Sequence, residues 1–191
     1  MTAFWYLTRG TGIVALVLLT LSVALGIANV RRMRLPGAPR FVTLGIHRSV
    51  SLLAVVFVLV HIATSVIDGY VPITVVDAVV PFSSAYHPFW IGLGAVSFDL
   101  LLAVVITSLL RRRVGYRTWR LVHWTAYASW PIALIHSIGT GTDAGSGWMT
   151  VLIVALVSVM IAAVLARLSA RRSRDPVLAP RRREPSLSPG H

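Results

Sequence analysis

Four histidines stand inside strongly apolar stretches of the sequence, and their spacing makes two similar pairs. His47 lies fourteen residues before His61, and His123 lies thirteen residues before His136. A neutral imidazole ligates metals through one ring nitrogen, and an imidazole that titrates near neutral pH relays protons. Polar rings are costly in an apolar setting, so four of them indicate a site that binds a metal-centred cofactor or carries protons.

The composition predicts that the stretches around these histidines cross a membrane. Hydrophobic residues make up 56% of the chain, charged residues 13%, and the mean hydropathy is +0.78. A soluble domain could not cover that much apolar surface. A helix needs about 17 to 25 residues to cross a hydrocarbon core of roughly 30 Å. Five segments qualify, at residues 5–28, 45–67, 89–110, 119–138 and 148–166.

We therefore predict an all-α fold, an integral membrane helical bundle with about five transmembrane helices. The bundle and its short loops fill residues 1–170 as one domain. Residues 171–191 are rich in arginine and proline and poor in apolar side chains, which predicts a disordered tail. The chain has no cysteine, so it has no disulfide and no cysteine-ligated metal site.

The charges predict the orientation of the bundle. The formal net charge is +12, and every basic side chain is an arginine. Arginines cluster after the first, third and fifth predicted spans, whereas the alternate loops carry Asp68, Asp77 and Asp143. We therefore expect a multi-pass protein of the plasma membrane. By the positive-inside rule its N-terminus lies outside and its C-terminus lies in the cytoplasm. This distribution indicates topology and contact with membrane lipid, and we expect no nucleic-acid partner.

In this topology the second and fourth spans both run from the cytoplasm outwards. His47 and His123 then lie near the inner ends, and His61 and His136 lie toward the outer ends. Imidazoles from two facing helices are typical axial ligands of haem iron. The sequence thus predicts two haems, one above the other, with ligands about 20 Å apart along each helix. Thirteen residues do not restore one helical face, and we expect Pro131 to rewind the fourth span.

Other interpretations of the histidines stay open. Each one alone is as well explained as a polar core residue bonded to a nearby hydroxyl, although matched depths favour ligation. A haem-free transporter or assembly subunit, using the histidines for proton or metal handling, is the alternative function. Two further histidines carry weaker signals. His87 stands in the outer loop, where it would bind a metal ion or an acceptor or simply be solvated, and His191 ends the tail.

The doubled histidine spacing, the stretch Arg111–Trp124 and the run Arg-Gly-Thr-Gly from Arg9 together resemble the ferric reductase-like transmembrane domain family. This family is related to the haem-binding membrane domains of ferric reductases and NADPH oxidases. The resemblance covers about residues 5–166. It implies two b-type haems, the inner one on His47 and His123 and the outer one on His61 and His136, and electron transfer across the membrane.

The resemblance also defines what we expect of partners. No glycine-rich dinucleotide fingerprint is present. We therefore expect an oxidoreductase component without its own NAD(P)H or FAD module, with a separate cytoplasmic flavoprotein or membrane quinol as donor. The external acceptor would be ferric iron or a partner reductase. An anchor subunit of a larger quinol-linked enzyme is a further alternative.

The propionate groups of haem are carboxylates, which arginine binds through two parallel hydrogen bonds. Several arginines are therefore candidates for holding a propionate. Arg48 and Arg120 adjoin the inner ligands, although ordinary topogenic charge explains them equally well. Arg9 is a candidate at the outer haem, and its simpler explanation is a snorkelling interfacial side chain. Trp130 is expected either between the haems or in ordinary helix packing. Asp99 is expected either to accept a proton or to be buried and hydrogen-bonded.

Overall fold

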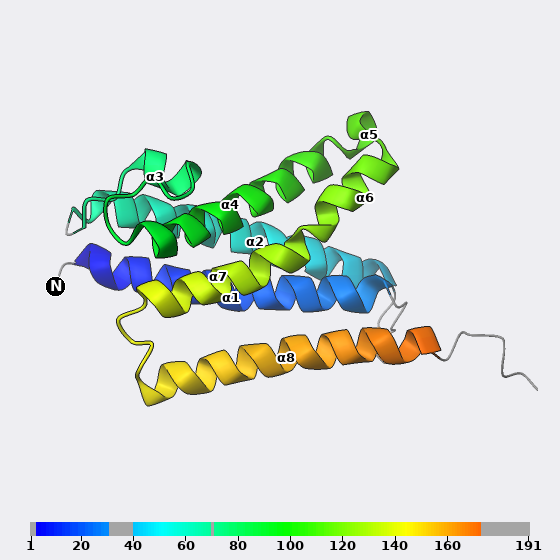
Figure 1. Cartoon of the computed structure of the whole chain (residues 1–191). Coiled ribbons are helices and arrows are strands. Elements are labelled where there is room, and N and C mark those ends of the chain that lie inside the picture. Colours follow the sequence, from blue (N-terminus) through cyan, green and yellow to red (C-terminus); the bar gives the residue numbers. More distant parts are fainter. Residues whose placement is uncertain (1–2, 31–39, 70, 173–191) are drawn as a thin grey trace, which may run out of the picture.

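The computed structural model describes residues 3–30, 40–69 and 71–172, and this part of the chain is helical with no strand (Figure 1). The prediction of an all-α fold is confirmed. The long helices are α1 (Ala3–Val30), α2 (Arg40–Ile67), α4 (Pro88–Leu109) and α8 (Gly147–Arg172). The short helices are α3 (Val75–Val79), α5 (Arg111–Val114), α6 (Tyr116–Trp124) and α7 (Ala126–Thr140). The predicted tail began at residue 171, but α8 continues through Arg172. The rest of the tail, residues 173–191, and the arginines at 31, 32 and 34 lie outside the described residues.

Four helices of the described chain, α1, α2, α4 and α8, are long and apolar enough to cross a membrane. They coincide with four of the five predicted spans. In lipid each backbone polar group needs a partner within the protein, and an unbroken helix supplies it. The remaining predicted span, residues 119–138, is divided between α6 and α7. The 15 residues of α7 extend only about 22 Å, so the crossing also requires α6.

The break between α6 and α7 lies at Thr125. Its N–H donates to the carbonyl of Val122 at 2.9 Å, and its hydroxyl donates to the same carbonyl at 2.7 Å. A threonine hydroxyl that competes for a helix carbonyl tightens and bends the helix. The helix then continues through Pro131. The rewinding expected at Pro131 stays a prediction, and the break at Thr125 is an additional irregularity that the sequence did not predict.

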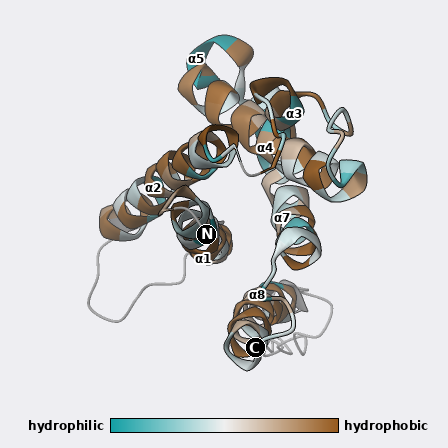
Figure 2. Cartoon of the chain, turned by 90° about the vertical axis from the view of Figure 1, so that its left-hand side faces the viewer, coloured by the Kyte–Doolittle hydropathy of each residue, from teal (hydrophilic) through white to brown (hydrophobic). Residues whose placement is uncertain are grey.

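The main helices form two antiparallel pairs, α1 with α2 and α4 with α7, and α8 packs on α1. Figure 2 shows α2 on one side of α1, with α7 and α8 on the other. We call the end of the bundle where α1 begins and α2 finishes the Asp143 end. The opposite end, which carries α5 and α6, is the arginine end (Figure 1).

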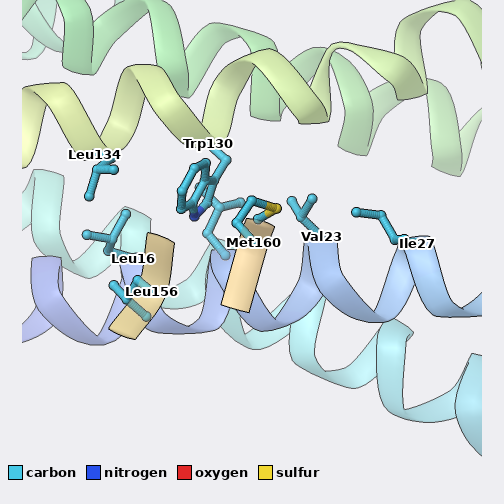
Figure 3. Close-up of a cluster of buried hydrophobic side chains, with 8 residues drawn as sticks. Leu16, Val23, Ile27, Trp130, Leu134, Leu156 and Met160 are labelled. Carbon is cyan, nitrogen blue, oxygen red and sulfur yellow. The ribbon is translucent and has the colours of Figure 1, made fainter. Parts of the chain in front are cut away.

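The buried core lies where α1, α7 and α8 meet (Figure 3). Its residues are Leu16, Leu19, Val23, Ile27, Trp130, Leu134, Leu156 and Met160. The four on α1 recur at helical spacing and therefore share one face. The indole N–H of Trp130 donates to the hydroxyl of Thr20 at 2.7 Å, and both side chains are buried. This bond joins α7 to α1 inside the apolar core.

A short capped helix, α3, covers part of the Asp143 end between α2 and α4. The Asp77 carboxylate accepts hydrogen bonds from the N–H and the hydroxyl of Thr74, each at 2.8 Å, and from the hydroxyl of Ser83 at 3.0 Å. The bonds from Thr74, followed by the one from Ser83, lower the pKa of the Asp77 carboxyl. Thr74 and Asp77 together form a capping box that fixes the start of α3.

Candidate functional site

The four membrane histidines lie on three helices that face one another across the bundle. His47 and His61 are on α2, His123 is on α6, and His136 is on α7. The rings of His61 and His136 stand at 80° to each other with 6.4 Å between their centroids. They approach from different helices toward the Asp143 end, as the sequence predicts for the outer pair.

His47 and His123 form the second group, at the arginine end. The ring of His123 stacks on Trp119, with centroids 4.9 Å apart and planes at 27°. Its Nδ1 atom is buried and has no hydrogen-bond partner within the described residues. The structure therefore brings His61 and His136 together, and it has His47 and His123 at the same end of the bundle.

Three of the four histidines donate a hydrogen bond from Nδ1 to a backbone carbonyl of a neighbouring helix. The bonds are His61 to Thr8 at 2.8 Å, His136 to Trp90 at 2.8 Å, and His47 to Ser22 at 3.0 Å. A carbonyl only accepts, so each of these rings carries its proton on Nδ1. The Nε2 atom of a neutral ring in this tautomer is unprotonated and able to bind a metal.

Glycines on α1 and α4 allow the rings to reach these carbonyls, a role that the sequence did not predict for them. A Cβ atom on Gly12 would lie 2.9 Å from Nδ1 of His61, and one on Gly94 would lie 2.7 Å from Cε1 of His136. A Cβ atom on Gly26 would lie 3.4 Å from Cε1 of His47. One sequence signal could have found two of them, because Gly12 and Gly26 have the same fourteen-residue spacing as the two histidines of α2.

The candidate arginines lie at both ends of the bundle. Arg48 and Arg120 are exposed at the arginine end, where the guanidinium of Arg120 lies 5.9 Å from the centroid of Trp124. Arg9 is half-buried at the other end, where it forms an ion pair with Asp143 and lies 4.1 Å from the centroid of Trp5. The pair ties the first turns of α1 to the loop between α7 and α8.

A cluster of aromatic and basic side chains surrounds His123 at the arginine end. Arg111 lies over Trp119 at 4.1 Å and over Tyr116 at 5.7 Å. The indole N–H of Trp119 donates to the hydroxyl of Ser108 at 3.2 Å. Because Trp119 also stacks on His123, a continuous set of contacts runs from the exposed Arg111 to a membrane histidine.

The family model described as ferric reductase like transmembrane component matches residues 11–134, which include three of the four histidines. This chain belongs to that family. His136 lies two residues beyond the match. No curated protein and no solved structure matches the chain significantly.

Membership confirms a multi-pass membrane protein and indicates an electron-transfer component. Transmembrane domains of this family generally bind haem, and the residues present fit that group. A bond from a metal to an imidazole nitrogen is about 2 Å long, and the ring centre lies roughly 1 Å beyond that nitrogen. Two imidazole rings that share one metal from opposite sides therefore have their centres about 6 Å apart. The 6.4 Å between His61 and His136 agrees with this spacing. Imidazole nitrogens are common ligands of haem iron, so both histidines would be able to hold this group.

The other predicted residues have separate surroundings. Trp130 packs in the core with α1 and α8, which is the packing alternative (Figure 3). Asp99 is half-buried on α4. His87 is exposed and precedes Pro88, the first residue of α4, with a φ of 42°. His191 lies outside the described residues.

Proposed function

We propose that the protein is a di-haem b-type cytochrome that moves electrons across the plasma membrane. Haem when bound supplies reversible one-electron chemistry, and the chain supplies ligands, position and a low dielectric. His47 and His123 would hold the inner haem, and His61 and His136 the outer one. The observation that carries the proposal is the close approach of His61 and His136, whose ring centres have the separation expected for two ligands of one metal.

The depth of the two pairs supports transfer across the membrane. The fourteen residues between the histidines of α2 correspond to about 21 Å of helix, which is most of a hydrocarbon core of roughly 30 Å. One pair lies toward each end of the bundle. Two sites at different depths would divide the crossing into short steps, which a single site could not do.

The charges support an orientation with the arginine end in the cytoplasm. Exposed arginines gather at that end, at positions 48, 111, 112, 113, 117 and 120. An acidic flavoprotein or a membrane quinol would deliver electrons there, beside the contacts from Arg111 through Trp119 to His123. Ferric iron or a partner reductase would accept them at the Asp143 end.

Arginines near the histidine pairs are proposed to hold haem propionates. Arg48 and Arg120 adjoin His47 and His123 in sequence and are exposed, so their guanidinium groups are free to turn toward the inner haem. Arg9 contacts Asp143, and its remaining N–H groups allow it to hold an outer propionate as well. Replacing each arginine with glutamine, with Arg113→Gln as the exposed control, tests these roles by the midpoint potential of each haem.

The decisive experiment is a reduced-minus-oxidised visible spectrum of the purified protein, with haem measured per chain. We expect two low-spin b-type haems. His61→Ala and His136→Ala should each remove the same haem, and His47→Ala and His123→Ala should each remove the other. His87→Ala, in an exposed loop, is the matched control and should retain both. A colourless folded protein after haem-replete expression would support the haem-free alternative, with the histidines in proton or metal handling.

A further inference from the structure

Three membrane histidines have the same local surroundings. Each lies against a glycine of a neighbouring helix and donates a hydrogen bond to the carbonyl four residues before that glycine. His61 contacts Gly12 and donates to Thr8, the residue four positions earlier on α1. His47 makes the same two contacts with Gly26 and Ser22, further along α1. The histidines come from one helix, and the glycine and carbonyl come from the adjacent one.

The same arrangement recurs on a different pair of helices. His136 on α7 contacts Gly94 and donates to Trp90, again four residues before the glycine, on α4. The recurrence on α4 is independent of the one on α1, because the two helices and their partners differ. A repeated spacing of four residues therefore calls for a common physical reason.

That reason follows from helix geometry. The carbonyl of residue i−4 accepts the N–H of residue i, and the side chain of residue i lies back over the preceding turn. A side chain at that position covers the second lone pair of the carbonyl. Glycine leaves it uncovered, so a histidine of another helix can approach and donate to it.

The fourth membrane histidine, His123, does not have these surroundings. Nδ1 of His123 is buried and has no hydrogen-bond partner within the described residues. Its ring is held instead by stacking on Trp119, a residue of its own helix. Stacking restrains the plane of a ring, but it does not fix which nitrogen carries the proton.

We propose that Gly12, Gly26 and Gly94 are positioning residues that expose helix carbonyls to three iron-ligating histidines, and that His123 is the ligand most easily displaced from iron. This inference rests on the proposed function. A carbonyl bond to Nδ1 fixes the ring, directs Nε2 to the metal and makes the imidazole a stronger electron donor. Exogenous small ligands should therefore enter at the haem of His47 and His123.

The first test replaces each glycine with alanine and measures haem per chain, the midpoint potential of each haem and the low-spin electron paramagnetic resonance signals. We expect Gly94→Ala and Gly12→Ala to remove the haem of His61 and His136, or to change its reduction equilibrium constant at least tenfold, about 59 mV for one electron. The other haem should be unchanged.

Gly26→Ala provides a milder variant and Gly10→Ala provides the control. Alanine at Gly26 needs a shift of only a few tenths of an ångström, so this variant should fold, keep both haems and alter the signal of the His47 haem alone. A Cβ atom on Gly10 meets nothing within 4 Å, so Gly10→Ala on the same helix should match the wild type. Gly12→Ala and Gly94→Ala indistinguishable from Gly10→Ala, or equal perturbation of both haems by each variant, would overturn the positioning role.

The second test adds carbon monoxide to the reduced protein and counts the haems that bind it. We expect binding at one haem per chain, absent from His123→Ala protein that has lost that haem, and faster binding in Trp119→Leu. Binding at the His61 haem, at both haems equally or at neither would overturn the assignment of His123 as the displaceable ligand. A wild-type protein without haem would refute the proposed function itself, whereas two haems with unresponsive glycines would refute only this inference.

Discussion

The hydrogen bond between Trp130 and Thr20 provides a quantitative test of the core. The indole N–H donates to the Thr20 hydroxyl at 2.7 Å, and that hydroxyl donates to the carbonyl of Leu16 at 2.8 Å. Thr20→Val removes the acceptor and leaves a buried N–H unpaired. An unpaired buried donor costs about 1–3 kcal/mol in proteins generally. Coupling between membrane helices averages about 0.6 kcal/mol and reaches about 1.7.

We therefore expect Thr20→Val to lower the free energy of unfolding by about 1–2 kcal/mol. Trp130→Phe removes the donor and leaves the Thr20 hydroxyl bonded to Leu16, so its cost comes from lost packing. In the Trp130→Phe background, Thr20→Val should cost little. The double-mutant cycle should give a coupling energy of about 0.6–1.7 kcal/mol.

Unfolding in mixed micelles, followed by far-ultraviolet circular dichroism, measures these free energies. A coupling energy indistinguishable from zero would refute the argument that this bond joins α7 to α1. The same variants decide the role of Trp130. Because its ring packs with α1 and α8, we expect both haem potentials to stay unchanged in Trp130→Phe. A shift in either potential that Thr20→Val does not produce would put Trp130 in the electron path.

Three further predictions concern the ends of the bundle. Asp143→Asn should lower the free energy of unfolding by less than about 1 kcal/mol, and the loss should disappear at high salt, because the ion pair with Arg9 is half-exposed. Arg9→Gln should in addition shift the midpoint potential of the outer haem. Equal effects of the two variants would limit Arg9 to a structural role. The folded pKa of Asp77 lies below its unfolded value of 3.8, so its capping contribution is complete above that value and is lost as pH falls through the folded pKa. Amide exchange within α3 should therefore accelerate at low pH in the wild type and show no such transition in Asp77→Asn. Trp119→Ala should alter the spectrum of the haem at His123 and leave the other haem unchanged, whereas a change in both spectra would indicate a general loss of structure.

Some features of the fold follow from local properties of the sequence, and others depend on side-chain geometry. Length and hydropathy are local properties, and they located α1, α2, α4 and α8 because a long apolar run in lipid has to satisfy its backbone internally. The break in the remaining span, at Thr125, was not predicted. A proline is a visible irregularity in a sequence, whereas a hydroxyl that competes for a helix carbonyl, as at Thr125, depends on local side-chain geometry.

The sequence by itself determined which residue types the candidate site contains and predicted their depths, because polar rings are costly in lipid and four histidines in two matched pairs indicate a function. Only the tertiary structure decided what each ring contacts. The bond from His61 to Thr8 joins residues 53 positions apart, and the pairing of Arg9 with Asp143 joins residues still further apart. Such contacts depend on how each helix is rotated against its neighbours. That rotation follows from the packing of all the helices together, so no single segment of the sequence encodes it.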